Sequence, residues 1–159
     1  PHAWVHVNHV EGGKTQAWMV EGGTPNTLIR GGLTRDSLKA GDEIRLFTGS
    51  DGYGDGEQVR DFIHVDDIVA VNLWAWRQAA KSGIYNLGTG QARSFNDVAR
   101  AVLKWHGRGR IQYVPFPGHL VGSYQSYTQA DLTGLRAAGY EGAFIPIEEG
   151  VPRYLDAIA

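Results

Sequence analysis

The spacing of hydrophobic and polar residues along the chain changes near residue 33. In residues 1–32 the apolar positions keep no helical period, and three Gly-Gly pairs interrupt them. Such a pattern favours one short strand at most. From residue 33 onward, apolar residues recur at helical or strand spacing. We therefore predict a divergent segment of unclear fold at residues 1–32 and a folded domain at residues 33–159.

Strands alternate with helices in the predicted domain. Short apolar or alternating runs predict strands at residues 43–48, 60–65, 84–87 and 111–114. Apolar residues at helical spacing predict helices at residues 66–83, 94–107, 128–139 and 152–158, and residues 33–40 can form a further short helix. The third strand is apolar on both faces, as a parallel strand covered by helices would be. This order predicts an α/β fold with short parallel strands and about four helices.

Polar residues and prolines at the ends of these elements support the predicted boundaries. Ser94 and Asp97 have the spacing of a capping box, in which each side chain bonds the backbone N–H near the other. The doubled acid at residues 66–67 can cap the following helix. Pro152 suits the first turn of the last helix, where its missing N–H costs nothing. The loop at residues 49–57 is too polar and too rich in glycine to pack.

Composition and charge exclude several classes of protein. The 159 residues include 17 acids and 15 bases, a formal net charge of −2, so no basic excess points to a nucleic-acid partner. The absence of Cys excludes a disulfide framework, a Cys-ligated zinc site and a thiol nucleophile. No apolar run approaches the roughly 18 residues of a membrane span, and no signal peptide is recognisable. We therefore expect a cytoplasmic protein with no membrane partner.

Two places in the chain can be interpreted as phosphate sites. The turn Gly88-Thr89-Gly90 lies between a predicted strand and a predicted helix, so it can bind a pyrophosphate or simply be a tight turn. Arg93 stands where a dinucleotide fingerprint has its third glycine, which argues against a cofactor there. Arg60 can offer its guanidinium fork to a phosphate, or it can form a structural salt bridge with Asp61 or another acid.

The histidines are weaker candidates. His2, His6 and His9 would share one face of a helix and could bind a metal, but the segment has poor helical character and solvated side chains explain them equally. His64 lies in a predicted apolar strand, where a hydrogen-bonded core histidine is commoner than a catalyst. We predict no metal site.

Several motifs carry a family resemblance. Arg-Asp-Phe-Ile-His-Val-x-Asp-Ile from Arg60 and Tyr-Asn-Leu-Gly-Thr-Gly from Tyr85 resemble the C-terminal half of extended short-chain dehydrogenase/reductase epimerases of sugar nucleotides. More narrowly, the stretches at 46–50, 71–74, 82–90, 111–117 and 124–132 resemble the ADP-L-glycero-D-manno-heptose 6-epimerases. The resemblance extends from about residue 33 to the end of the chain.

The resemblance implies a function. Such enzymes interconvert two ADP-heptoses for lipopolysaccharide core synthesis, use bound NADP to oxidise and re-reduce the sugar at C6, and are homo-oligomers. It also implies that Phe47, Thr48, Gly49 and Ser50 form the loop that holds the ADP-sugar. Arg60 and Tyr124 are then further substrate contacts.

The sequence departs from that family in its catalytic and cofactor motifs. The glycine fingerprint for NADP and the catalytic Tyr-x-x-x-Lys are missing, and Asn8 and Lys14 have the wrong spacing to replace other catalytic residues of the family. We therefore assign no catalytic residue and expect no cofactor for this chain alone. The prediction is an ADP-heptose-binding portion of an NADP-dependent epimerase; the alternative is a non-catalytic remnant that serves as a binding or oligomerisation module.

Overall fold

The computed structural model describes residues 9–11, 14–16, 43–77 and 83–158. Its first elements are two short antiparallel strands, β1 (His9–Glu11) and β2 (Lys14–Gln16). The other predictions for the first 42 residues, including the helix at 33–40 and the positions of His2 and His6, fall outside the described residues.

The predicted strands at 43–48 and 111–114 are confirmed, and they pair with each other. β3 (Glu43–Phe47) lies parallel to β6 (Arg110–Val114), with Ile44 opposite Ile111. Burial alternates along β3, where Ile44 and Leu46 are fully buried between exposed or partly exposed neighbours. That alternation is the period of a strand with one face on the core.

The helix after the capping box also forms as predicted. β5 (Arg93–Ser94) pairs antiparallel with β4 (Val59–Arg60) and leads directly into α3 (Phe95–His106). The Ser94 hydroxyl accepts from the Asp97 N–H at 3.1 Å, and the Asp97 carboxylate accepts from the Ser94 N–H at 3.3 Å. Gly107 ends the helix at φ 66°, a left-handed conformation that glycine adopts without strain.

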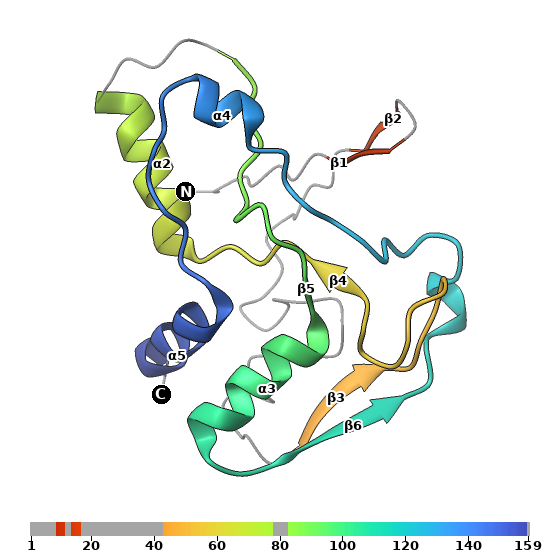
Figure 1. Ribbon diagram of the computed structural model, residues 1–159. Helices are drawn as coiled ribbons and strands as arrows, with labels where there is room; N and C mark the ends of the chain where they lie inside the picture. Colours follow the sequence, from red (N-terminus) through yellow and green to blue (C-terminus); the bar gives the residue numbers. More distant parts are fainter. Residues whose placement is uncertain (1–8, 12–13, 17–42, 78–82, 159) are drawn as a thin grey trace.

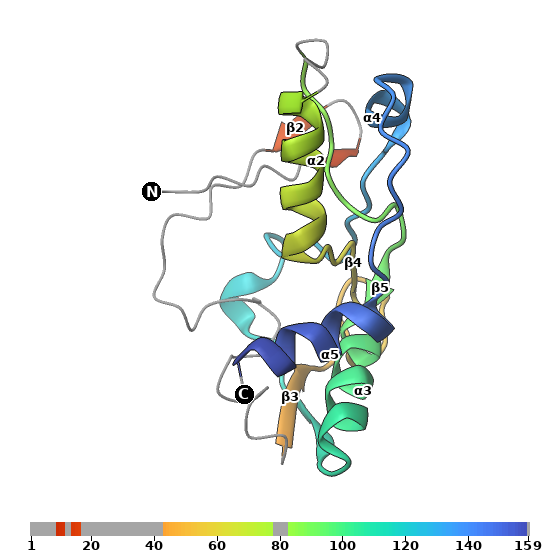
Figure 2. The same cartoon turned by 90° about the vertical axis from the view of Figure 1, so that its left-hand side faces the viewer.

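The main hydrophobic core lies between β3, α3 and the last helix, α5 (Ile147–Ile158). Figures 1 and 2 show α5 crossing beside α3, with β3 and β6 next to them. The core's buried members are Ile44, Leu46, Phe95, Val98, Ala99, Val102, Ile147 and Leu155. The predicted position of Pro152 is wrong: α5 begins five residues earlier, at Ile147, so this proline lies inside the helix.

The other end of the molecule is built on α2 (Val65–Arg77) and α4 (Thr133–Ala137) (Figure 1). A smaller apolar cluster of Val71, Leu135 and Tyr140 lies there. Between β6 and α4, the chain forms one turn of 3₁₀ helix, η1 (Gly118–Leu120). None of the helices in the described part of the chain has the length and hydrophobicity that a membrane crossing requires.

Two predicted strands are wrong in extent or existence. Only Val59–Arg60 pairs as a strand, because the chain leaves the ladder at Asp61 and enters α2 four residues later. The described residues 83–87 form no strand, and Ile84 is 88% exposed. Tyr85 and Leu87 instead pack on the Val71 cluster, so their apolar character reflects burial against helices rather than a sheet.

The doubled acid at the start of α2 does not cap the helix as predicted. Asp66 and Asp67 lie in its first turn, and the Nδ1 atom of His64 accepts the Asp66 N–H at 3.2 Å. The buried Asp67 carboxylate accepts the N–H of Ile145 at 2.9 Å, which links α2 to the segment before α5. His64 is therefore a hydrogen-bonded structural residue, in line with its interpretation as a core histidine.

Candidate functional site

The candidate site begins where β3 ends. The Thr48 N–H donates to the carbonyl of Val114 at 2.8 Å, which extends the parallel pairing by one residue. The Thr48 hydroxyl accepts the N–H of Phe116 at 3.1 Å. Thr48, directly before the glycine-rich loop at residues 49–57, is therefore held by β6 and the segment that follows it.

The loop itself is ordered by its own turns. The Gly49 N–H donates to the Asp55 carboxylate at 2.8 Å, and the Tyr53 N–H donates to the Ser50 carbonyl at 3.0 Å. Gly56 has φ 67° and is buried, and a Cβ there would come within 2.5 Å of the Asn96 amide oxygen. The prediction that this loop is too polar to pack is thus wrong at Gly56, where the lack of a side chain allows close packing.

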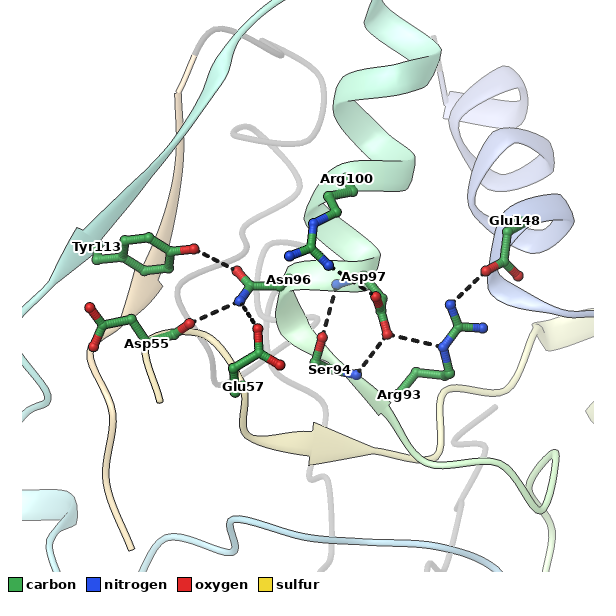
Figure 3. Close-up of polar contacts among 9 residues, drawn as sticks. All are labelled: Asp55, Glu57, Arg93, Ser94, Asn96, Asp97, Arg100, Tyr113 and Glu148. Atoms are coloured by element: carbon green, nitrogen blue, oxygen red, sulfur yellow. Dashed lines mark hydrogen bonds and ion pairs between the residues drawn. The ribbon is translucent and has the colours of Figure 1, made fainter. Parts of the chain in front are cut away.

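Asn96, at the start of α3, holds the outer part of the loop (Figure 3). Its side chain is buried, and its Nδ2 atom donates to the Asp55 carbonyl at 2.9 Å and to the Glu57 carboxylate. The Tyr113 hydroxyl donates to the Asn96 amide oxygen at 3.0 Å. One buried amide therefore connects the loop to α3 and β6 together.

Gln58 holds the inner part of the loop. Its side chain is 2% exposed, and its Nε2 atom donates to the Thr48 carbonyl at 3.1 Å and to the Ser50 hydroxyl at 3.2 Å. Sequence reasoning missed both Gln58 and Asn96. Their polarity beside a loop gives no signal of burial, and only their packing under the loop reveals their role.

Arg60 lies over the ring of Tyr124, with the guanidinium carbon 4.9 Å from the ring centroid. One guanidinium nitrogen donates to the Val59 carbonyl at 2.8 Å, and within the described residues no carboxylate lies at ion-pair distance from Arg60. Partial burial lowers the pKa of Arg60 from its usual value, and the interaction with Tyr124 opposes that effect. Burial likewise raises the pKa of Tyr124, which the guanidinium partly offsets.

Aromatic contacts join this arginine to the glycine-rich loop. The Tyr124 and Phe116 ring centroids are 5.3 Å apart, and those of Phe116 and Phe47 are 5.6 Å apart, both edge to face. The structure thus brings the predicted site residues together in one continuous region. These six are Phe47, Thr48, Gly49, Ser50, Arg60 and Tyr124.

The alternative salt bridge between Arg60 and Asp61 is not formed. The Asp61 carboxylate instead accepts from the Thr89 N–H at 2.7 Å, the Thr89 hydroxyl at 2.6 Å, the Gly90 N–H at 2.9 Å and the Ala130 N–H at 3.0 Å. Two backbone donors of the glycine turn, those of Thr89 and Gly90, are therefore occupied by a side chain of the same protein. That turn does not fit a pyrophosphate, because a carboxylate already lies where the phosphate oxygens would bind.

Two further kinds of site, a metal site and an open hollow, were also considered among the described residues. Within the part of the chain that the structure describes, no three acidic or histidine side chains are grouped as metal ligands. An open hollow of about 930 Å³ lies beside the glycine turn, lined in part by Asn86, Gln129, Asp131 and Arg136. It includes none of the six predicted site residues, so size alone does not identify the site.

Sequence comparisons divide the chain. Residues 1–58 match a family of unknown function, DUF6152. A stretch of 122 residues, 77% of the chain, is 59% identical to an ADP-L-glycero-D-manno-heptose-6-epimerase from Alkalilimnicola ehrlichii, which confirms the resemblance stated above. The chain spans only 38% of that relative's length. The predicted boundary between residues 32 and 33 lies inside the first match and outside the described residues, so it stays a prediction.

Similar solved structures include two epimerases of sugar nucleotides and confirm the α/β fold. The ADP-L-glycero-D-manno-heptose-6-epimerase of Helicobacter pylori is 29% identical, with a TM-score of 0.58 over 73% of this chain and 32% of that one. The UDP-glucose 4-epimerase of Thermotoga maritima, solved with UDP-glucose, is 25% identical, with a TM-score of 0.59 over 77% and 37%. Other similar structures contain NAD or NADP.

Proposed function

We propose that this chain, whose matched residues are the C-terminal part of an ADP-L-glycero-D-manno-heptose-6-epimerase sequence, binds the ADP portion of a sugar nucleotide. The contacts are the loop Phe47, Thr48, Gly49 and Ser50, together with Arg60 and Tyr124. The observation that carries the proposal is the partly buried guanidinium of Arg60, which has no carboxylate partner among the described residues.

The physical reason is the cost of burying an unpaired cation. Burial opposes the charged form of Arg60, whereas a phosphate would favour it and would offer oxygens to the planar fork. Tyr124 keeps one face of the guanidinium against an aromatic ring, and the N–H groups that do not bond the Val59 carbonyl can then donate to a phosphate. A diphosphate supplies the required charge, and the relatives named for ADP-heptose and bound to UDP-glucose act on such molecules.

Epimerisation is a property that we propose for a whole enzyme of this family and not for this chain alone. A redox step at the sugar needs NADP or NAD held against the carbinol and an acid–base group beside it. No described residue is assigned to either role. In a whole enzyme, the bound nucleotide sugar would be an intermediate of lipopolysaccharide core synthesis in the cytoplasm.

Calorimetric titration of the full chain with ADP tests the proposal. We expect saturable binding, weakened by about ten- to a hundredfold in Arg60→Ala, because a charge-assisted hydrogen bond contributes about 1.5–3 kcal/mol. Arg100→Ala is the matched control, since that arginine is exposed and ion-paired with Asp97. Binding that is absent at millimolar ADP, or equal in Arg60→Ala and the native chain, would contradict the nucleotide site.

A second candidate function, self-association, is favoured by α2. Its residues Val65, Val69, Leu73 and Trp76 recur on one helical face and are exposed by 58%, 49%, 39% and 78%. We propose that a second copy of this chain covers this face with its own α2, running antiparallel. That arrangement brings the acidic first turn of each helix near the basic last turn of the other.

Light scattering of the full chain tests this candidate. We expect a dimer or larger species for the native chain and a monomer for Trp76→Lys, because a lysine in the apolar stripe opposes burial. Val121→Lys is the control, since Val121 is 70% exposed but lies far along the chain from α2. A native monomer at high micromolar concentration would rule out the dimer.

A further inference from the structure

We propose that Gln58 is a positioning residue that fixes the direction of the Ser50 hydroxyl, so that Ser50 acts as a hydrogen-bond donor to a phosphate of the bound nucleotide. The inference rests on the proposed function in one respect, because it takes the loop at residues 47–50 to face the ligand. Gln58 itself is buried beneath the loop and would touch neither the nucleotide nor the sugar.

The orientation of the Gln58 amide follows from its partners. A backbone carbonyl can only accept hydrogen bonds, so the atom 3.1 Å from the Thr48 oxygen has to be the amide nitrogen. The same nitrogen lies 3.2 Å from the Ser50 hydroxyl oxygen. The two bonds use both amide hydrogens, and the second one enters a lone pair of the serine.

This arrangement constrains the direction in which the Ser50 hydroxyl can donate. A serine hydroxyl has a single hydrogen, and here its oxygen already accepts from Gln58, so the hydrogen has to point away from that amide. Phosphate oxygens at neutral pH are chiefly acceptors, so a hydroxyl that presents its hydrogen suits them. Together with the guanidinium of Arg60, the loop then offers donors to an anion.

Backbone hydrogen bonds of Gln58 and Val59 hold the Gln58 side chain in the orientation that directs the Ser50 hydroxyl. The Phe95 N–H donates to the Gln58 carbonyl at 3.2 Å, and the Val59 N–H donates to the Ser126 carbonyl at 2.9 Å. The Ser126 hydroxyl in turn lies 2.7 Å from the Asp51 carboxylate, in the residue after Ser50. Because the Gln58 backbone and its side-chain amide are both hydrogen-bonded, Gln58 holds the loop in its binding conformation before the ligand binds.

A double-mutant cycle in ADP binding by the full chain tests the inference. We expect Ser50→Ala to weaken binding by about fivefold and Gln58→Glu by about tenfold or more, because a carboxylate would accept the serine hydrogen and turn it away from the ligand. With both substitutions, the loss should stay close to that of Gln58→Glu alone. Losses that multiply, or native affinity in Gln58→Glu, would overturn the positioning role.

The pH dependence separates positioning from a purely structural effect. In Gln58→Glu, burial raises the carboxyl pKa, and the protonated acid regains an O–H donor toward the loop. The ratio of native to variant affinity should therefore fall between pH 8 and pH 5, since the titration of ADP is common to both proteins. In Gln58→Leu, which has no titratable group, the ratio should stay constant. A constant ratio in both variants would contradict the inference.

Amide hydrogen exchange tests the inference without any substitution at Gln58. In NMR spectra of the native chain, both side-chain amide hydrogens of Gln58 should exchange slowly, and Ser50→Ala should speed the exchange of one of them. Free exchange of both would overturn the inference even if ADP binds. If the native chain binds no ADP, the nucleotide site and this role both fail, whereas binding with unaffected Gln58 variants removes only the role of Gln58.

Discussion

The two ends of the molecule differ in how completely they bury their apolar side chains. In the core region, formed by β3, β6, α3 and α5, the two helices and β3 enclose a cluster of eight buried apolar residues. In the α2–α4 region, the buried cluster has three members, and Val69 and Trp76 on α2 are exposed by 49% and 78%. Figure 1 shows these regions at opposite ends of the fold. The first region closes its own core, whereas the second leaves apolar surface open.

The comparison bears on the proposed nucleotide site, which lies beside the core region. The glycine-rich loop is held by Asn96, Gln58 and the pairing of Thr48 with Val114, all of which belong to the core region or border it. Its geometry therefore does not depend on whatever covers α2. Binding by the loop and association through α2 should be separable properties of the same chain.

The largest expected loss of unfolding free energy comes from truncating one buried leucine to alanine in each of the two apolar clusters. Leu46→Ala, at a fully buried position in the core region, should lower the free energy of unfolding by about 3–4 kcal/mol in urea denaturation. Leu135→Ala, at a 1% exposed position in the smaller cluster, should lower it by about 2 kcal/mol, since partly exposed neighbours can relax into the space.

Val121→Ala, at an exposed position, is the control and should change the unfolding free energy by less than about 0.5 kcal/mol. Equal losses for the two leucine variants would break the distinction between a closed core and an open one.

The next largest loss of unfolding free energy is expected at Asp61, whose hydrogen bonds connect the two regions; we call this the joint. The Asp61 carboxylate accepts four hydrogen bonds, from Thr89, Gly90 and Ala130, and so ties the end of β4 to the segments that lead to α3 and α4. Asp61→Asn replaces one acceptor oxygen by an NH₂ group that faces other donors, and should cost about 2 kcal/mol of unfolding free energy. Asp55→Asn is the comparison and should cost less, because Asp55 is exposed and its carboxylate accepts one hydrogen bond, from the Gly49 N–H. An equal or smaller loss in Asp61→Asn would mean that the joint is not structural.

The smallest expected loss of stability comes from removing an ion-pair network within the core region. Arg93 bridges Asp97 on α3 and Glu148 on α5, as Figure 3 shows. Burial acts to raise the pKa of Asp97, but the hydrogen bonds from Arg93 and the Ser94 N–H lower it overall, and the bond from Arg93 lowers that of Glu148. Arg93→Ala should therefore lose about 1 kcal/mol of stability at pH 7, because these groups are partly exposed.

The pH dependence of this loss has a definite sign. A carboxyl whose pKa is lowered by folding contributes stability above its unfolded value, and that contribution disappears as pH falls through the folded value. The ordinary values are 3.8 for Asp97 and 4.5 for Glu148, so the difference between native and Arg93→Ala should shrink from about pH 5 downward. Urea unfolding at pH 7, 5 and 3 measures it, with Arg153→Ala as an exposed control. A difference that grows toward pH 3 would refute the pairing.

Local signals in the sequence predicted the parts of the fold that depend on near neighbours. The capping box at Ser94, the glycine stop at Gly107 and the strands at β3 and β6 all form as predicted. The same signals failed at residues 84–87, because an apolar run describes burial without saying whether a sheet or helices provide the cover. They also failed for Asp66 and Asp67, since His64 was free to take the capping position.

For the candidate site, the sequence pointed to residues but not to their arrangement. The motifs around Phe47, Arg60 and Tyr124 identified a family, and the structure places these side chains in one aromatic and cationic region. Their role in binding stays a prediction. The buried amides of Gln58 and Asn96 could not be found from the sequence, since nothing in the pattern says that a polar residue lies beneath a loop.

The sequence by itself determined both ends of α3, the strands β3 and β6, and the family to which most of the chain is similar. These depend on hydrogen bonds and side-chain periods that span a few residues, or on motifs long enough to be specific. Only the tertiary structure decided which partner each charged or polar side chain took. Asp61 could have paired with Arg60 beside it, yet it binds backbone groups 28, 29 and 69 positions away, which leaves the guanidinium without this carboxylate. Such choices are made by packing between distant segments, and local sequence does not encode them.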